Sequence, residues 1–352
     1  MARLPDARSP VGSSIASMRK RVHVLVGPLL LIAGFASAQP ASLVKDINPG
    51  VGLQPAFFGH SDPVRSGNFV YFTSDAGGSG TELWRTDGTP GGTILLTDLF
   101  PPVPFQSPAP QNLTDVNGTL FFTTGTSSSS ALWKTDGSAA GTVALARLNP
   151  GEYIYSVASA GGVLYFFKSV PTGSELWKSD GTPAGTVLVR AGLTGDINAT
   201  FSVLNGTVFF SANDGSSGDE LWKTDGTAAG TLLAHDINPG PSDSRPSSFA
   251  VFGGALYFSA CEPTHGCEIW KSDGTDAGTV LVKDIYPGSG SSGASGFVPT
   301  AAGLVFGATD GVSGVELWKS DGTDTGTTLL RDIRPGAASS FPSLLTAASG
   351  GV

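Results

Sequence analysis

The sequence predicts an all-β fold, specifically a β-propeller built from four-stranded antiparallel blades. A motif related to Glu-Leu-Trp-Lys-Ser-Asp-Gly-Thr-x-x-Gly-Thr recurs six times in the 352 residues. The copies are centred on Trp84, Trp133, Trp177, Trp222, Trp270 and Trp318, at intervals of 49, 44, 45, 48 and 48 residues. A fixed period of this size indicates one supersecondary unit copied along the chain.

Each copy contains four short β-type runs separated by turn residues. In the fifth copy they are Phe249 to Phe252, Ala255 to Cys261, Cys267 to Ser272 and Thr279 to Ile285. The first two runs are joined by a dipeptide that tolerates the positive φ of a tight hairpin turn. These dipeptides are Gly253-Gly254, Asn117-Gly118, Gly161-Gly162, Asn205-Gly206 and Gly350-Gly351. Four antiparallel strands in one such unit describe a propeller blade, and a β-solenoid is the alternative fold.

The two ends of the repeat region predict a seventh, incomplete blade. Residues 43–50 match the last strand of a repeat, and residues 341–352 match a first strand and turn. Propellers commonly close by completing one blade from both termini, so we expect six complete blades plus a split seventh. On this interpretation the domain spans residues 39–352 and is truncated at its C-terminus. A six-bladed ring with two spare strands is the competing arrangement.

The N-terminus predicts export. Residues 18–21 are a basic stretch, the run from Val22 to Phe35 is almost wholly apolar, and Ala36-Ser37-Ala38 has the form of a cleavage site. We expect a signal peptide over residues 1–38, and residues 1–17 are a mis-annotated extension if translation starts at Met18. The apolar run is too short for a membrane span, so no membrane insertion is expected after cleavage. The protein is then extracellular, on the cell surface or periplasmic.

The charge of the mature chain argues against nucleic acid as a partner. Cleavage leaves 15 basic and 28 acidic residues, a net charge of −13. A surface of this sign repels phosphate backbones and anionic lipid.

The turn after the tryptophan predicts a register for the last two strands. Pairing Ser272 with Thr279 places Trp270 opposite Leu281 and Glu268 opposite Lys283. The same alignment pairs Glu316 with Arg331, Glu175 with Arg190, Glu220 with His235 and Glu82 with Thr97. In the second copy both positions are alanine, Ala131 and Ala146, as a cross-strand ion pair predicts. We therefore expect exposed, structural ion pairs contributing up to about 1 kcal/mol each.

These repeats resemble the ELWxxDGT repeat family of bacterial exported proteins, and the resemblance covers nearly all of residues 43–352. It implies a secreted, propeller-type repeat protein with no generally established activity. The departures from the motif are Ala131, Ser138 and Ala191.

All six copies keep an aspartate in the turn after the tryptophan strand. They are Asp87, Asp136, Asp180, Asp225, Asp273 and Asp321. Because glycine follows each one, we expect the carboxylate to accept hydrogen bonds from its own turn. Calcium is the alternative, but the closely spaced carboxylates of a calcium loop are missing, so no cofactor is predicted.

The only two cysteines, Cys261 and Cys267, flank the short segment Glu262 to Gly266. In an exported protein a disulfide is the default expectation, and closing so small a loop contributes about 2 kcal/mol or less. Zinc is disfavoured because His265 is the single nearby imidazole.

No local catalytic motif is present, and we name no catalytic residue. We expect a monomeric, non-enzymatic binding module for a protein or glycan. Its specificity is predicted in the loops between the second and third strands, chiefly Ser127 to Ser130 and Glu262 to Gly266, and in the Asn-Pro-Gly connections. The alternative is a propeller-type hydrolase or lyase acting on an extracellular glycan. That function predicts several convergent acids with perturbed pKa values in a central channel.

Overall fold

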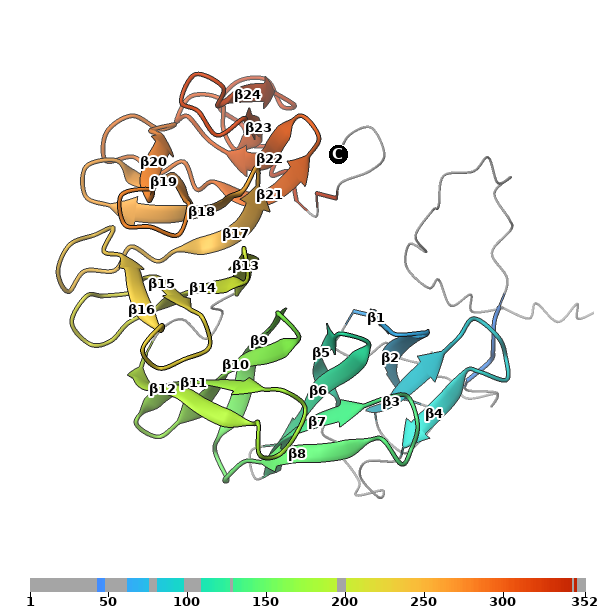
Figure 1. Ribbon diagram of the computed structural model, residues 1–352. Helices are drawn as coiled ribbons and strands as arrows, with labels where there is room; N and C mark the ends of the chain where they lie inside the picture. The colour runs from blue at the N-terminus through green and yellow to red at the C-terminus, as the bar shows by residue number, and fades with distance from the viewer. Residues whose placement is uncertain are drawn as a thin grey trace, which may run out of the picture.

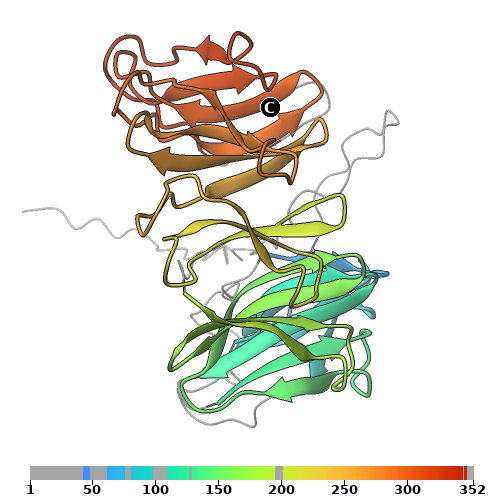
Figure 2. The same cartoon turned by 60° about the vertical axis from the view of Figure 1, so that its left-hand side comes forward.

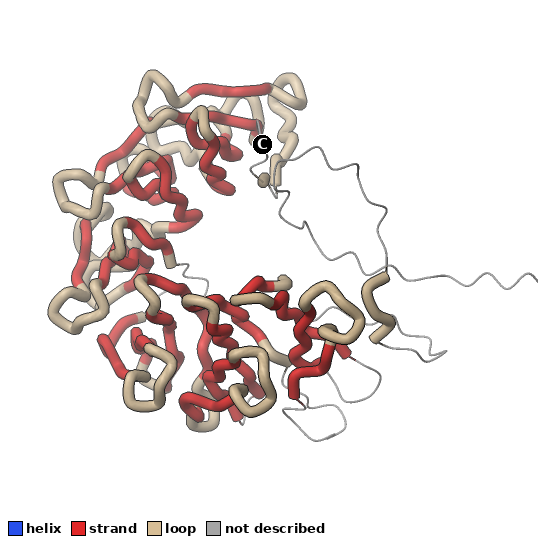
Figure 3. Tube along the Cα trace, turned by 45° about the vertical axis from the view of Figure 1, so that its right-hand side comes forward, coloured by secondary structure: helices blue, strands red, loops and turns tan. Residues whose placement is uncertain are grey.

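The computed structural model describes residues 43–47, 62–75, 81–97, 109–126, 129–194, 201–343 and 345–346. The predicted signal peptide and half of the residues of the predicted seventh blade lie outside these ranges. Within them the protein is all-β, as predicted, and no helix occurs (Figure 3). Consequently the described part of the chain holds no helix that could cross a membrane.

In the described part of the chain, twenty-four strands form six antiparallel sheets of four strands each, paired in chain order. We number the sheets 1 to 6 along the chain. Sheet 1 contains β1 (Val64–Ser66), β2 (Phe69–Asp75), β3 (Thr81–Thr86) and β4 (Ile94–Thr97). Sheet 2 contains β5 (Gln111–Val116), β6 (Thr119–Thr126), β7 (Ser129–Thr135) and β8 (Val143–Arg147). Sheet 3 contains β9 (Tyr153–Ala160), β10 (Val163–Val170), β11 (Gly173–Ser179) and β12 (Val187–Leu193).

The remaining sheets repeat this order. Sheet 4 contains β13 (Ser202–Leu204), β14 (Thr207–Ala212), β15 (Glu220–Thr224) and β16 (Leu232–His235). Sheet 5 contains β17 (Ser247–Phe252), β18 (Ala255–Glu262), β19 (Gly266–Ser272) and β20 (Val280–Lys283). Sheet 6 contains β21 (Ser295–Thr300), β22 (Gly303–Ala308), β23 (Glu316–Ser320) and β24 (Thr328–Arg331). The predicted four strands per repeat are therefore confirmed.

The sheets follow one another along an arc (Figure 1). Their first strands line the concave side and their fourth strands the convex side. A view turned by 60° shows neighbouring sheets lying face to face (Figure 2). Because consecutive strands run in opposite directions, successive loops alternate between the two ends of each sheet. At one end lie the loops between second and third strands and the connectors to the next sheet, and we call it the connector face. The other end carries the turns that join the first to the second strand and the third to the fourth strand, and we call it the turn face.

Five apolar cores fill the spaces between consecutive sheets. The tryptophan of each later sheet packs against the sheet before it. Trp222, for example, is 1% exposed and shares a core with Tyr165 and Leu176 of sheet 3. Removing this apolar surface from water is the main term that holds sheet to sheet.

The Asp-Gly-Thr-x-x-Gly-Thr segment forms the turn between the third and fourth strands. In sheet 5, Asp273 Oδ1 accepts hydrogen bonds from Thr275 N at 2.8 Å and Thr275 Oγ1 at 2.7 Å. Equivalent bonds occur at all six turn aspartates. These hydrogen bonds, chiefly from the Thr275 hydroxyl, hold the pKa of Asp273 below its usual range. A Cβ on Gly278 would lie 2.0 Å from Asp273 Oδ1, which explains the second glycine of the motif.

The register after the tryptophan differs from the prediction in one respect. Trp270 does pair with Leu281, but a β-bulge between Ile269 and Trp270 shifts the following pair, so Lys283 faces Ile269. A bulge adds one residue to one strand and moves later side chains to the other face of the sheet. The predicted pairing of Glu268 with Lys283 is therefore wrong. The same shift excludes the pairs proposed for sheets 1, 4 and 6, and in sheet 2 Ala131 faces Arg147 rather than Ala146.

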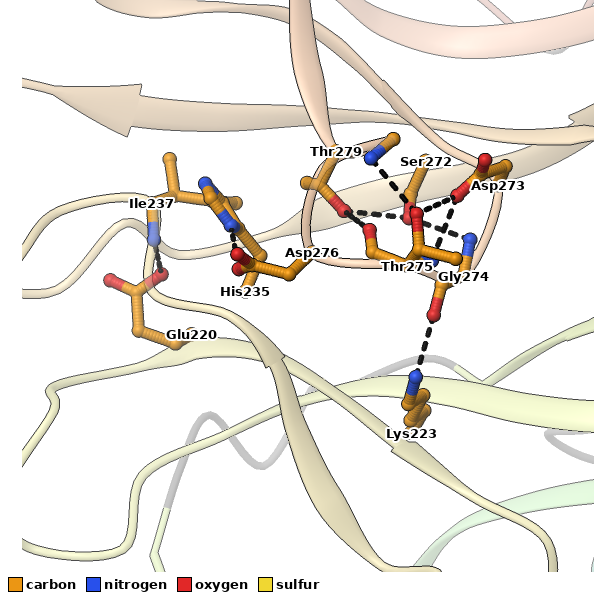
Figure 4. Close-up of polar contacts among 11 residues, drawn as sticks. Glu220, Lys223, His235, Ile237, Ser272, Asp273, Gly274, Thr275, Asp276 and Thr279 are labelled. Carbon is orange, nitrogen blue, oxygen red and sulfur yellow. Dashed lines mark hydrogen bonds and ion pairs between the residues drawn. The ribbon is translucent and has the colours of Figure 1, made fainter.

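The basic residues at this position instead bind the turn of the next sheet. His235 Nδ1 lies 2.6 Å from Asp276 Oδ1, and Lys283 Nζ lies 3.1 Å from Asp324 Oδ1. In sheet 3, whose third and fourth strands also pair through bulges, Arg190 Nη1 donates to Thr231 O at 2.9 Å. A second contact runs nearby, where Lys223 Nζ donates to Gly274 O at 2.6 Å (Figure 4). The turn face is thus held together by polar contacts between sheets.

The segment Leu43–Ile47 forms no strand, so the described residues contain no sheet for the predicted seventh blade. It nevertheless lies where a preceding fourth strand would lie, because Lys45 Nζ donates to Thr93 O at 2.6 Å, as Arg190 does to the turn of sheet 4. At the other end, Leu330 and Ile333 of sheet 6 are 44% and 52% exposed, whereas their counterparts Val282 and Ile285 are buried.

Candidate functional site

The glutamate of the repeat is buried on the connector face rather than exposed. Glu220 Oε2 accepts from Ile237 N at 2.8 Å and from Ser244 Oγ at 2.6 Å. Its Oε1 accepts from Ser244 N at 3.1 Å and Asn238 N at 3.3 Å. All four donors belong to the connector that leads from sheet 4 to sheet 5. The carboxylate therefore fixes the connector, and its hydrogen-bonding capacity is taken up by the fold.

Glu268 and Glu316 repeat this arrangement in sheets 5 and 6. Glu268 accepts from Ile285 N at 3.0 Å and Ser292 N at 2.9 Å. Glu316 accepts from Ile333 N at 2.7 Å and Ser340 N at 2.9 Å. The geometry agrees with the expectation that these glutamates are structural, but their partners are backbone N–H groups and serine hydroxyls rather than cations.

Burial sets the protonation of these carboxyls. It raises the pKa of Glu220 to about 7, against hydrogen bonds from Ser244 and Ile237 that act in the opposite direction. It also raises the pKa of Glu268. At Glu316 burial acts the same way, but the hydrogen bonds from Ser340 and Ile333 outweigh it and lower the pKa. A raised carboxyl pKa is common at active sites, yet here burial beneath the connector accounts for it.

We call the contact between each of these glutamates and its connector a clasp. The connector serine of each clasp also links one sheet to the next. Ser244 N donates to Asp219 O in sheet 4 at 2.9 Å, and Ser244 O accepts from Cys261 N in sheet 5 at 2.8 Å. Ser292 repeats these bonds between Cys267 O and Thr309 N, each at 3.0 Å. The connector serine is therefore a bridge between neighbouring sheets.

Sheet 2 departs from this pattern and opens a cavity. Ala131 stands where the repeat has glutamate. In addition, the segment from Pro150 to the first hairpin turn of sheet 3 is three residues shorter than the segment from Pro239 to the first hairpin turn of sheet 5. Neither the glutamate nor the bridging serine is present. A cavity of about 290 Å³ occupies this place on the connector face. Its wall includes Gln111, Thr123, Thr124, Ser130, Ala131, Glu152 and Tyr153.

Glu152, which sequence analysis did not single out, supplies a carboxylate from the connector instead. Its Oε2 accepts from Asn149 N at 3.0 Å, the counterpart of the bond from Asn238 to Glu220. Lys168 Nζ lies 3.6 Å from Glu152 Oε1 and 3.0 Å from Glu175 Oε2. Burial opposes ionisation of Glu152, but the Asn149 hydrogen bonds and the charge of Lys168 outweigh it and lower its pKa. The cavity wall thus carries an ionised carboxylate.

Glu175 also corrects the prediction for sheet 3. Its ion pair is with Lys168 of β10 rather than with Arg190, and it accepts from Trp177 Nε1 at 2.8 Å. Arg190 instead lies over the ring of Trp222 in sheet 4, 4.6 Å from its centroid.

Tyr153 borders the cavity at the start of β9. Its side chain is 44% exposed, whereas the neighbouring Tyr155 is half-buried. The two rings lie 6.0 Å apart, and Tyr155 stacks on Phe167 at 5.7 Å. Tyr155 and Phe167 belong to the core between sheets 3 and 4, so the Tyr153 ring lies on the face of sheet 3 that is turned away from sheet 2.

The other predicted sites have different outcomes. The disulfide between Cys261 and Cys267 is confirmed, and it joins β18 to β19. His265 Nδ1 bonds to Glu262 Oε1 within the same loop. Ser127 and Ser128 lie outside the described residues, but Ser130 and the Asn-Pro-Gly connector at Gly151 both line the cavity. Among the residues the structure describes, no group of three or more histidine, cysteine or acidic side chains is placed to hold a metal.

Comparisons with known proteins show no family. No protein-family model matches the chain, and no curated protein is similar to it in sequence. Among solved structures it is similar to oligopeptidase B from Leishmania major, with 16% identity, a TM-score of 0.47, and coverage of 78% of this chain and 41% of that one. The uncharacterized protein lmo1340 from Listeria monocytogenes gives 10% identity, a TM-score of 0.44, and coverage of 77% and 82%. A puromycin hydrolase gives 15% identity, a TM-score of 0.43, and coverage of 70% and 42%. The chain therefore spans about two-fifths of the length of the hydrolases it resembles.

Proposed function

We propose that this chain is a propeller-type repeat protein of the ELWxxDGT kind, exported from the cell, that binds a glycan or protein through its connector face. The arc of six sheets with one core per seam supports the propeller. The position of Lys45 and the exposed apolar face of sheet 6 fit a further blade between the two ends.

The cavity beside Ala131 is the single observation that carries the binding function. In sheets 4, 5 and 6 the same place is filled by a glutamate whose donors all come from the protein itself. In sheet 2 a cavity takes the place of that glutamate. A recess on the loop-bearing face of a rigid scaffold is where binding residues are expected.

A hydrolase or lyase of the propeller type is the second candidate. The perturbed carboxyl of Glu220 is the observation in its favour, because catalytic acids often have raised pKa values. Against it, that carboxyl is saturated by connector donors, and its counterparts lie in separate sheets. The geometry therefore favours binding over catalysis.

The test combines a glycan array with screens for glycosidase and peptidase activity, all on the mature protein secreted from a host. We expect retention of a glycan or protein without turnover. Turnover of any substrate that survives purification controls would overturn the non-enzymatic assignment. A protein that retains no glycan and turns over no substrate would overturn glycan binding.

A further inference from the structure

We infer that the face of sheet 6 turned away from sheet 5 binds a β-hairpin of the same repeat type that is supplied by another polypeptide. The hairpin carries a tryptophan and an Asp-Gly-Thr turn, as the second and third strands of the sheets in this chain do. Sheet 6 ends the described arc (Figure 1), far along the chain from the cavity of sheet 2. The inference therefore goes beyond the binding proposed for the connector face and does not depend on it.

The apolar part of this face is built like the faces that other sheets bury. Sheet 5 buries its apolar face beneath Trp318 of sheet 6. The buried side chains are those of Ile269, Val282 and Ile285. Their counterparts in sheet 6 are Leu317, Leu330 and Ile333. Leu317 is half-buried and the other two are exposed, so in the described residues this face lacks the tryptophan that would cover it.

Two cations of sheet 6 occupy the positions that bind the next turn at the seam before. Lys271 Nζ donates to the glycine carbonyl in the turn of sheet 6 at 2.9 Å, and Lys283 Nζ lies 3.1 Å from Asp324 Oδ1 of that turn. Their counterparts are Lys319 and Arg331. Both are exposed, and no acceptor among the described residues binds either of them. They complement a turn that offers a carbonyl oxygen and an aspartate.

The connector that leaves sheet 6 presents a matching backbone acceptor. After sheet 5, Ser292 O accepts from Thr309 N in sheet 6 at 3.0 Å. After sheet 6, Ser340 N donates to Val315 O at 3.0 Å, so this connector is anchored as the previous one is. Within the described residues no N–H group donates to Ser340 O. The end of an incoming second strand would supply that donor.

One continuous segment makes all of these contacts at the seam between sheets 5 and 6. Residues 303–327 contain the Thr309 N–H, the Trp318 ring, the turn carbonyl and Asp324. A hairpin of second and third strands with its turn can therefore satisfy the apolar face, the two cations and the connector together. This requirement defines the partner by its chemistry.

The occupant comes from outside the six described sheets. All six tryptophans of the 352 residues belong to sheets 1 to 6, so these residues hold no further copy of the motif for this face. Sheet 1 of a second copy is a poorer fit, because Lys45 Nζ already donates to Thr93 O in its turn at 2.6 Å. Arg331 would need that turn. We therefore assign the face to a different polypeptide that carries the repeat hairpin.

The probe is a synthetic peptide of residues 255–279, which includes β18, β19 and the turn that follows. An isolated two-stranded hairpin is marginally stable in water, but here the disulfide between Cys261 and Cys267 joins the two strands. Isothermal titration calorimetry measures binding of the oxidised peptide to the mature protein. The same peptide with Trp270→Ala is the control on the ligand side.

Three protein variants locate the site. Leu330→Glu places a charge in the apolar face, and Lys319→Ala removes one of the two cations. Leu232→Glu is the matched control, because Leu232 is a leucine of similar exposure, 48%, in the fourth strand of sheet 4. Lys319→Ala alters an exposed side chain and keeps the test valid if the Leu330 variant fails to fold.

We expect the oxidised peptide to bind, with affinity reduced about tenfold or more by L330E in the protein or W270A in the peptide. K319A should weaken binding about threefold, and L232E should leave it unchanged. Absence of peptide binding would overturn the inference, and so would binding that L330E and K319A leave intact. Sedimentation of the mature protein alone provides the last outcome, since self-association abolished by L330E would overturn the choice of a different polypeptide in favour of a second copy. Loss of peptide binding in an L330E protein that is still retained on the glycan array would show that the two binding surfaces are separate.

Discussion

The buried glutamate clasp gives the sharpest test of how the fold is held together, and Glu220→Ala is the chosen perturbation. The substitution removes the acceptor for four connector donors. Ser244 keeps an alternative, since its N and Oγ also reach Asp219 O at 2.9 and 3.2 Å. Ile237 N is buried and loses its acceptor, whereas Asn238 is half-buried and can reach water.

The expected magnitude follows from these donors. A buried donor left without an acceptor costs about 1–3 kcal/mol. Counting Ile237 in full and Asn238 and Ser244 in part, we expect the free energy of unfolding to fall by about 3 kcal/mol. The control is Asp276→Ala, which removes one ion pair from a side chain that is 84% exposed and should cost under about 1 kcal/mol.

Urea unfolding followed by tryptophan fluorescence measures both variants, with the slope of the transition checked for a change in cooperativity. Limited proteolysis should also show new cleavage between residues 236 and 246 in E220A. If E220A and D276A unfold at the same urea concentration, with no new cleavage, the connector is not held by this carboxylate and the account of the clasp is wrong.

Four further predictions follow from described contacts. The folded pKa of Glu220 is about 7, against 4.5 in the unfolded chain. The free energy of unfolding that this difference supplies is therefore fully present below pH 4.5 and is lost as the pH rises through 7. Urea titrations across that range should show a fall of about 3 kcal/mol that E220Q flattens, and an equal slope in both proteins would contradict the assignment. Replacing both Cys261 and Cys267 with alanine should cost about 2 kcal/mol in the same assay, and reducing agent should then have no effect on the variant. Gly278→Ala should lower the urea midpoint by displacing the Asp273 carboxylate, and the double variant D273A/G278A should be no less stable than G278A, whereas additive losses would show that the two residues act separately. Arg190→Ala should weaken the seam between sheets 3 and 4 by about 1 kcal/mol through loss of the Trp222 ring contact and the bond to Thr231 O, while Arg190→Lys should recover less than half.

The repeat made much of the fold predictable. The strands of sheet 5 lie within a few residues of their predicted bounds, because alternation of apolar residues and glycine turns is a local property. Gly253 and Gly254 both have positive φ, as the hairpin dipeptide implied. The burial of the tryptophans between sheets also follows from their period.

The register beyond the tryptophan could not be predicted because a bulge leaves no mark in the local sequence. The predicted register assumes that each residue of the third strand faces one residue of the fourth. The bulge between Ile269 and Trp270 adds a residue to one strand, so the pairs beyond it are shifted. The partners of Glu268 were consequently misassigned, although its structural role was not.

The sequence contains a sign of the cavity, the alanine at position 131, but its pattern predicts a lost ion pair instead. Ala131 was noticed as a departure, but its coincidence with Ala146 suggested a lost ion pair. The more informative coincidence was with the shortened connector and Glu152, which lie in the next repeat. Such a relation between segments appears only when the sheets are placed beside one another.

The serine bridges have a consequence for how the protein opens. Sheets 4, 5 and 6 are linked in series by Ser244 and Ser292, so the loss of one sheet removes hydrogen-bond partners from its neighbour. The junction after Pro150 has no such serine. There Leu148 N donates to Ser130 O at 2.9 Å within sheet 2, and the polar link described between the two sheets is a long bond of 3.4 Å from Asn112 Nδ2 to Ile154 O. Hydrogen exchange should therefore divide the chain near Gly151, with amides of the later block sharing one opening rate and those of the earlier block another.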